Sequence, residues 1–338
     1  MALAGSLGDY LHRGVQCAEL VLPGESSVNR DPSQGVGVKI GILLPIAETD
    51  SGTILRYKDI RDAALQAERD GFNSVWIVDH LLFEWDGQRR GIWEGWTLLS
   101  ALAEATERVE LGTLVMCTAF RNPALLAKMA DAVDEVSDGR FIFGLGAGWH
   151  EPEFTAFGYP FDHLASRFED ALRIIAPLVR TGVADHQGTY ERAIRCVSLP
   201  RGPRPEGPPI LVGASRPRML RLTAELADAW NTCWLGRASE LPERLAPMHT
   251  ACAEVGRDPA TLEVTVGQIV TMPESTREGE DEGDERFKFT NPDALAEEWR
   301  LFQEQGVGHL IVWPQPYDAG CLNLLTAAQR IYRDRSGE

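Results

Sequence analysis

The sequence predicts a (β/α)8 barrel, or TIM barrel, of the α/β class, and three observations support it. Eight apolar segments of strand length alternate with helix-like segments along one chain. The strand segments are near-continuous apolar runs, which indicate strands buried on both faces. The composition, 44% hydrophobic and 25% charged, is that of an ordinary globular chain. A doubly wound open sheet is the structural alternative, but it needs fewer strands.

The first half of the barrel follows from clear start and stop signals. Ile60 and Ala64 lie on one face of a helix that Gly71 ends. A later helix begins with Asn122 as N-cap and Pro123 at its first position. The predicted strands are Val38–Leu44, Ser74–Val78, Val109–Met116 and Arg140–Gly146, and the helices between them are 57–70, 94–107 and 123–136.

The second half continues the alternation after an irregular stretch, Ala147 to Ala165. Gly188 to Leu199 is expected to form a short extended or hairpin excursion outside the barrel. The remaining predicted strands are 209–213, 229–233, 262–272 and 309–313, and the helices are 166–181, one beginning at Ser215, 239–255, 291–305 and 320–334.

These elements indicate one barrel domain over 38–335, preceded by an N-terminal arm, 1–37. We expect insertions at about 147–165, 183–208 and 273–290. Within the last, 274–285 holds seven carboxylates against one arginine and predicts a solvated loop.

Charge and cysteine usage exclude several classes of partner. The balance of 33 basic and 50 acidic residues gives a net charge of −17, which disfavours nucleic acid and anionic membrane surfaces. No apolar run approaches the roughly 20 residues of a membrane span, and the first residues lack a basic signal region. The six cysteines have no paired spacing, so reduced thiols and a cytoplasmic location are expected.

In a TIM barrel the functional residues follow the carboxyl ends of the strands. This rule selects Pro45, Asp79-His80, Met116-Cys117-Thr118, Gly146 to His150, Gly213-Ala214-Ser215, Cys233-Trp234, Gln268 or a residue near it, and Trp313.

The selected set argues against several kinds of chemistry. His80 and His150 have no partner at metal-ligand spacing, so no metal site is predicted. No GxSxG motif supports triad hydrolysis. The alternating glycines of 144–148 lack the helix and spacing of a dinucleotide fingerprint, but they let a flat ring or a phosphate approach the backbone.

Two further features suggest a ligand site. Gly213-Ala214-Ser215 precedes a helix N-terminus, where free N–H groups attract an anion, and Arg216 and Arg218 add positive charge. A plain N-cap is the structural alternative for Ser215. An apolar substrate pocket is predicted from the side chains of Trp85, Trp149, His150, Trp234 and Trp313.

These motifs together resemble the bacterial luciferase-like oxidoreductase family. The resemblance covers roughly Val38 to Asp334 and rests on 73–80, 111–115, 121–129, 137–141, 144–149, 213–215 and 227–231. It implies a TIM barrel that holds a flavin or deazaflavin at the carboxyl ends of its strands. The Asp-His, Arg-Asn-Pro and Gly-Ala-Gly-Trp segments are more similar to the branch that uses coenzyme F-420, an 8-hydroxy-5-deazaflavin.

Carried over to this chain, the resemblance assigns His80 as the catalytic proton donor or ring-polarising group. Asp79 would contact the ring system, and Leu114-Val115, often a non-proline cis peptide in this branch, would line it. The other implied cofactor contacts are Met116, Cys117, Thr118, Gly146, Ala147, Gly148, Gly213, Ala214 and Ser215. A structural His80, bonded to Asp79 or to backbone, is the alternative.

The resemblance leaves three functions open. The first is hydride transfer between the deazaflavin and a small or medium apolar organic substrate. The second is an FMN-dependent two-component monooxygenase that uses reduced FMN and O2, with a flavin or deazaflavin reductase as partner; the third is a non-catalytic flavin-binding relative. Sugar-phosphate dehydrogenases of the family carry glutamate where this chain has Trp149, so that activity is not expected. A homodimer is expected.

Overall fold

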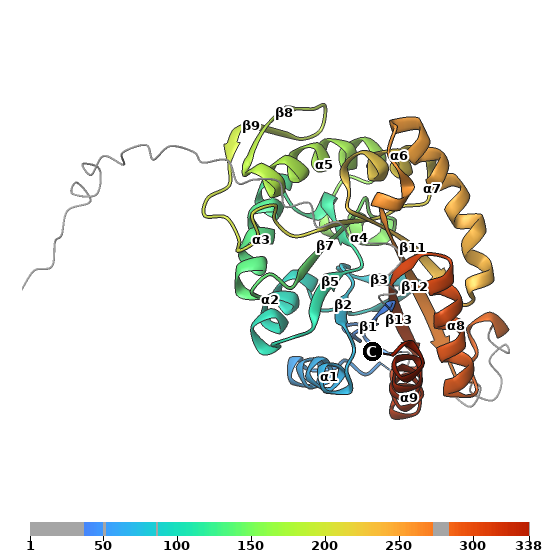
Figure 1. Ribbon diagram of the computed structural model, residues 1–338. Helices are drawn as coiled ribbons and strands as arrows, with labels where there is room; N and C mark the ends of the chain where they lie inside the picture. The colour runs from blue at the N-terminus through green and yellow to red at the C-terminus, as the bar shows by residue number, and fades with distance from the viewer. Residues whose placement is uncertain (1–36, 50–51, 86, 273–283, 338) are drawn as a thin grey trace, which may run out of the picture. The chain divides into compact units, whose positions relative to one another are not determined.

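The computed structural model describes residues 37–49, 52–85, 87–272 and 284–337, and within these residues eight parallel strands close into a barrel. The prediction of a TIM barrel is therefore confirmed. Helices surround the strands (Figure 1). In order around the barrel, the strands are β1 (Lys39–Leu43), β2 (Ser74–Ile77), β5 (Glu110–Thr113), β7 (Phe141–Gly146), β10 (Ile210–Gly213), β11 (Ala229–Leu235), β12 (Glu263–Thr271) and β13 (Val307–Gln315).

Two pairings close the ring. Ile42 of β1 lies in register with Val312 of β13, so the first strand pairs with the last. At the opposite side, Phe143 of β7 pairs with Ile210 of β10, although more than sixty residues separate them in the sequence. All of these pairings are parallel, so every strand delivers its carboxyl end to the same face.

The barrel helices return the chain between strands, and their caps follow the predicted signals. Asn122 accepts a hydrogen bond from the Leu125 N–H, and Asn291 accepts one from the Ala294 N–H. The helices are α1 (Tyr57–Asp70), α2 (Gly95–Ala105), α3 (Pro123–Val136), α5 (Leu164–Thr181), α6 (Pro217–Leu226), α7 (Leu241–Val255), α8 (Pro292–Glu304) and α9 (Ala319–Ser336).

The barrel interior is a packed core of its own. Trp76 is fully buried there, and a Cβ at Gly112 would lie 2.2 Å from its ring, which explains the glycine on the neighbouring strand. Below it, the Trp76 Nε1–H donates to the Ser74 hydroxyl, which lies 2.7 Å from Nε2 of His309. These three buried polar side chains therefore satisfy one another inside the barrel.

The structure corrects three expected boundaries. The strand expected over 109–116 is divided into β5 and β6 (Met116–Cys117), with a cis peptide between Leu114 and Val115. The segment expected to be irregular, 147–165, contains α4 (Glu151–Phe157) and the start of α5. A helix of seven residues is too short to show an apolar period in the sequence. The helix expected from Ser215 begins at Pro217, in the position that favours proline.

Two antiparallel hairpins lie outside the barrel. One, β3 (Phe83–Trp85) with β4 (Gln88–Arg90), follows β2 and was not expected, because strands of three residues carry no readable pattern. The other, β8 (Val183–Gln187) with β9 (Arg192–Val197), lies within the predicted insertion 183–208 and confirms the expected excursion. The arm expected over 1–37 falls outside the described residues except for Gly37, as does most of the acidic segment.

None of the described helices combines the length and the apolar character that crossing a bilayer would require.

Candidate functional site

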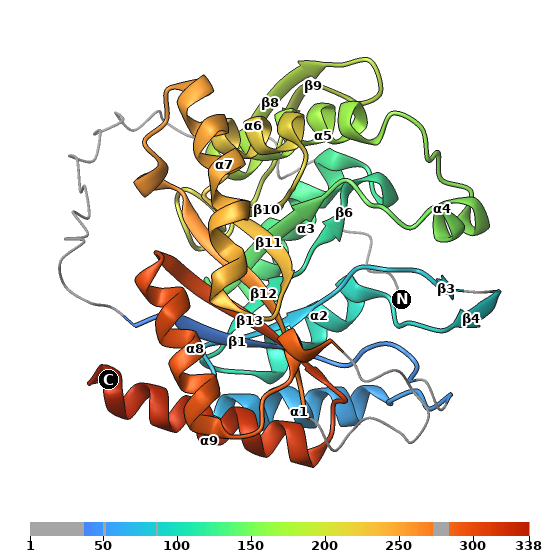
Figure 2. The same cartoon turned by 90° about the vertical axis from the view of Figure 1, so that its right-hand side faces the viewer.

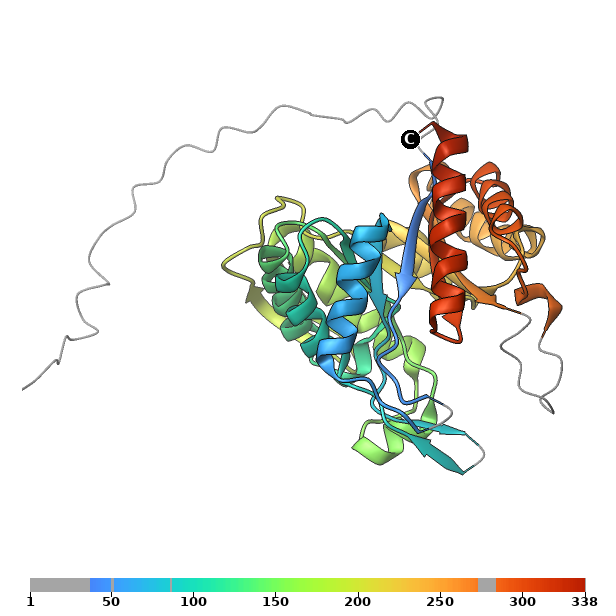
Figure 3. The ribbon, with the colours of Figure 1, turned by 90° about the horizontal axis from the view of Figure 1, so that it is seen from below.

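Sequence-predicted residues from several strands meet at the carboxyl end of the barrel. α4 and the β3–β4 hairpin project from this end and lie against each other (Figures 2 and 3). His80 lies in the segment between β2 and β3, and Trp149 and His150 follow β7. The fold therefore brings together three of the predicted residues that the sequence places about 70 positions apart.

His80 is held by a buried glutamate that the sequence analysis did not identify. Nδ1 of His80 lies 2.9 Å from Oε1 of Glu153, in the first turn of α4. The second carboxylate oxygen, Oε2, accepts the Leu81 N–H at 2.7 Å. The Glu153 side chain is 1% exposed and that of His80 is 13% exposed. The glutamate thus fixes both the imidazole and the backbone beside it.

Aromatic rings enclose the other sides of His80. Its ring centroid lies 4.5 Å from that of Phe83 and 5.7 Å from that of Trp149. The Trp149 side chain is 56% exposed, so it forms an open edge and not a buried wall. Trp85 ends β3 in the same hairpin as Phe83.

His150, unlike His80, hydrogen-bonds to the backbone of the β3–β4 hairpin. Its Nε2 accepts the N–H of Glu84 at 3.0 Å, which ties the β3–β4 hairpin to the end of β7. Burial lowers the pKa of His150 below its ordinary value, so the neutral ring that this hydrogen bond requires is favoured. The nitrogen that could exchange a proton is therefore occupied in a structural bond.

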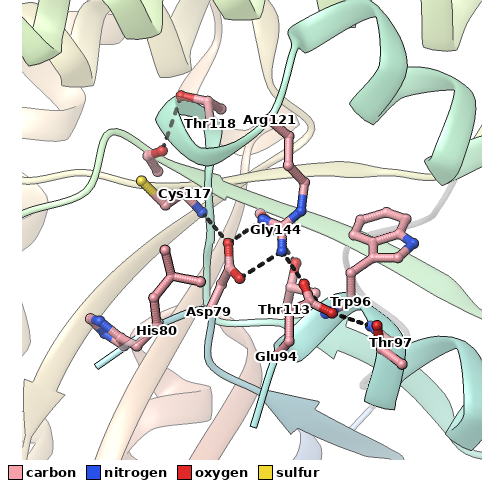
Figure 4. Close-up of polar contacts among 12 residues, drawn as sticks. Asp79, His80, Glu94, Trp96, Thr97, Thr113, Cys117, Thr118, Arg121 and Gly144 are labelled. Carbon is pink, nitrogen blue, oxygen red and sulfur yellow. Dashed lines mark hydrogen bonds and ion pairs between the residues drawn. The ribbon is translucent and has the colours of Figure 1, made fainter. Parts of the chain in front are cut away.

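Asp79, the residue before His80, forms an ion pair with Arg121 (Figure 4). Its two oxygens accept from the Arg121 guanidinium at 2.7 and 3.0 Å, and Oδ2 also accepts the Cys117 N–H at 2.9 Å. Arg121 continues to Glu94, which caps α2. In Figure 4, His80 points away from this chain of charges. The structural alternative in which Asp79 binds His80 is not what the structure shows.

Burial raises the pKa of Asp79 in spite of its hydrogen bonds from Arg121 and Cys117, so the network holds a carboxylate whose charged form its surroundings disfavour. Burial acts against the charged form of Arg121, yet its hydrogen bonds with Asp79 and Glu94 raise its pKa above the ordinary value. Burial also acts to raise the pKa of Glu94, but bonds from Thr97 and Arg121 lower it. Because both Asp79 oxygens are used, Asp79 supports the site from below; its contact with a cofactor stays a prediction.

Val115 projects between two glycines at the end of the barrel. A Cβ at Gly146 would lie 2.5 Å from Cγ2 of Val115, and a Cβ at Gly213 would lie 3.4 Å from both of its methyl groups. Leu114 is buried below in the interior cluster, whose partly exposed members include Val115, Trp234 and Trp313. The two indole rings lie 5.0 Å apart. An apolar surface that a flat ring can approach is therefore present.

The segment before α6 holds the two features on which the predicted anion site rests, a helix N-terminus and arginine side chains. Ser215 is exposed and precedes Arg216, which occupies the N-cap position, so the cap role considered for Ser215 is wrong. The Arg218 guanidinium is bound to Glu169 and to the Ser166 hydroxyl. Within the part of the chain that the structure describes, the Arg216 guanidinium has no hydrogen-bond or ion-pair partner.

Three of the remaining predicted cofactor contacts are buried. Met116, Cys117 and Thr118 are at most 4% exposed, and the Thr118 hydroxyl donates to the Gly146 carbonyl. Burial raises the pKa of the Cys117 thiol far above its usual range, so it is no nucleophile. Ala147, Gly148 and Ala214 are partly exposed. No cluster of three metal-ligating side chains occurs among the described residues.

The arrangement brings a histidine with a buried carboxylate partner to the same end of the barrel as an apolar surface and the predicted anion site. A signal for the missed residues exists only in part. Arg121 stands directly before the Asn-Pro helix start, which is a signal in the sequence. Glu153 could be recognised only once α4 is known, because the helical period then places its side chain on the face of α4 toward the segment after β2.

Comparisons with known proteins identify the family to which this barrel is similar. A family model described as luciferase-like monooxygenase matches residues 38–309. The chain is similar to a pyrimidine monooxygenase RutA of Methylobacterium radiotolerans, at 28% identity over 232 residues, 64% of this chain and 59% of that protein. It is also similar to an F-420-dependent glucose-6-phosphate dehydrogenase of Amycolatopsis mediterranei, at 30% identity over 198 residues, 56% of this chain and 57% of that protein. The chain thus spans less than two thirds of the length of either relative.

A solved structure gives the same fold. An F-420-dependent secondary alcohol dehydrogenase, in complex with an F-420–acetone adduct, matches with a TM-score of 0.71 at 17% identity. The match covers 88% of this chain and 100% of that chain. At this identity the likeness supports the fold alone.

Proposed function

Because the chain belongs to the luciferase-like monooxygenase family, we propose that it is an oxidoreductase that binds coenzyme F-420. In this proposal, a hydride passes between the deazaflavin and a small or medium apolar organic substrate. The observation that carries it is the pairing of His80 with the buried Glu153 beside the apolar end of the barrel. A proton donor or acceptor beside a dry surface is what hydride transfer to or from an organic substrate requires.

The residues present fit a flat cofactor with an anionic tail. The absence of side chains at Gly146 and Gly213 leaves Val115 accessible as a support for a ring. Arg216 and the N–H groups at the start of α6 would hold a phosphate. The net charge of −17 makes this uncommitted cation a favoured place for an anion in an otherwise acidic protein.

The deazaflavin would supply the carbon that accepts or gives the hydride. In the protein, His80 exchanges the accompanying proton, held in place by Glu153. Phe83 and Trp149, whose rings lie beside the imidazole, orient the substrate. Asp79 and Arg121 fix the end of β2 and the start of α3 underneath, so that these groups keep their distances.

The second candidate is an FMN-dependent monooxygenase. The similarity to a pyrimidine monooxygenase favours it. The same anion site would take the FMN phosphate, and a separate reductase would supply reduced FMN. A homodimer is proposed for either function, and its mass in solution would test that assembly.

Equilibrium titration of the purified protein separates the two candidates. F-420 and FMN are each added in oxidised and reduced form, and bound cofactor is followed by its absorbance and by quenching of tryptophan fluorescence. We expect F-420 to bind in the micromolar range or tighter and FMN to bind more weakly. Micromolar binding of FMN with no binding of F-420 would overturn the proposal and favour the monooxygenase.

A further inference from the structure

Glu153 has no role in the proposed function except through His80, and hydrogen bonding to its carboxylate determines which nitrogen of His80 carries the proton when the imidazole is neutral. The carboxylate is 1% exposed and meets two groups, the His80 imidazole at 2.9 Å and the Leu81 N–H at 2.7 Å. A buried ionised carboxylate is costly unless donors satisfy it. Both contacts must therefore donate to it for the site to be stable.

The hydrogen-bond inventory then decides which nitrogen of His80 carries the proton. An ionised carboxylate only accepts hydrogen bonds, and an amide N–H only donates. Because Oε2 of Glu153 is taken by the Leu81 N–H, Oε1 faces Nδ1 of His80 and requires a proton there. A neutral imidazole with Nδ1 protonated has its lone pair on Nε2.

We infer that Glu153 is a positioning residue that fixes the tautomer and orientation of His80 and leaves Nε2 as the atom that exchanges the proton. The inference rests on the proposed function for the catalytic importance of His80. His150 does not compete for this role, because its Nε2 accepts the Glu84 N–H. The rings of Phe83 and Trp149 lie beside the imidazole, with centroids at 4.5 and 5.7 Å from its own.

A purely structural role for Glu153 would have a different consequence. The glutamate would then only join α4 to the segment after β2, and the Leu81 N–H would be sufficient for that. Replacing the carboxylate by an amide distinguishes the two roles. In Glu153→Gln, the amide oxygen can accept the Leu81 N–H only if the NH2 group faces His80. That NH2 group donates to Nδ1 and moves the imidazole proton to Nε2.

The experiment uses the full, cofactor-free chain, so its result does not depend on which cofactor binds. Ring nitrogens of 15N-labelled histidine are observed by NMR at a pH where the rings are neutral, since their shifts separate protonated from unprotonated nitrogen. Loss of signals in His80→Gln assigns the residue. Glu151→Gln is the matched control, because Glu151 lies in the same turn of α4 with an exposed side chain.

We expect Nδ1 of His80 to be protonated in the native protein and in Glu151→Gln, and Nε2 to be protonated in Glu153→Gln. A native tautomer with Nε2 protonated, or an unchanged tautomer in Glu153→Gln, overturns the inference. If Glu153→Gln does not fold, the native spectrum decides alone. Failure of F-420 to bind would overturn the proposed function and leave this result standing, so the two failures are distinguishable.

Discussion

Replacing Gly146 by alanine tests whether Val115 is held as a support between two glycines. The new Cβ would lie 2.5 Å from Cγ2 of Val115, a distance that requires the valine to move. Valine is stiff at χ1, and its methyl groups already lie 3.4 Å from the position of a Cβ at Gly213. Overpacking of this kind costs roughly 1–3 kcal/mol. We expect a loss of that size in the free energy of unfolding, with weaker F-420 binding.

Gly213→Ala is the matched control, because its Cβ would meet the same valine at 3.4 Å. Both glycines lie outside the left-handed region, so alanine lowers the entropy of the unfolded chain equally in both variants. Urea unfolding and F-420 titration are measured for both, and for the double variant Val115→Ala with Gly146→Ala. The double variant should recover most of the lost free energy of unfolding but, because it lacks the valine that supports the ring, not the binding. Equal losses in the two single variants, or no recovery, would refute the role assigned to Val115.

Three further predictions follow from buried or charged groups. Burial lowers the pKa of His309 to about 3, below the value of about 6.5 expected in the unfolded chain. The contribution of neutral His309 to stability is therefore present above pH 6.5 and lost as the pH falls toward 3. The loss amounts to about 2 kcal/mol in the free energy of unfolding between pH 7 and 5. Urea unfolding at both pH values should show this loss in the native protein and not in His309→Gln. Arg216→Ala should weaken cofactor binding about tenfold, whereas Arg218→Ala, which removes an arginine already bound to Glu169, should not; equal effects in the titration would contradict the assigned anion site. Arg140→Met should destabilise the fold by roughly 2–4 kcal/mol, because the guanidinium donates to three backbone carbonyls and one hydroxyl, and a melting temperature within a degree of native would contradict this.

The order of the elements could be predicted because each depends on neighbouring residues. The apolar run Val38–Leu44 indicates a buried strand by itself, and β1 lies inside it. Asn122 and Pro123 mark a helix start that the structure confirms. The barrel then follows from the count and alternation of such elements, and with it the end at which His80 lies.

Short elements and their partners could not be predicted in the same way. α4 and the β3–β4 hairpin are too short for a period, yet they carry Glu153 and Phe83 to His80. The boundary of α6 was missed for another reason. Ser215 has a residue type that favours the N-cap, but it lies one position before the N-cap residue.

The sequence by itself determined the barrel, the position of His80 and the family resemblance, because local patterns of polarity and short motifs carry that information. Only the tertiary structure decided the partners. It joined His80 to Glu153 across 73 residues and Asp79 to Arg121 across 42 residues, and it left Arg216 available while Arg218 was bound. The physical reason is that a hydrogen bond depends on distance and direction to within a few tenths of an ångström. Spacing along the chain does not encode such distances; the packing of strands and helices from distant parts of the chain sets them.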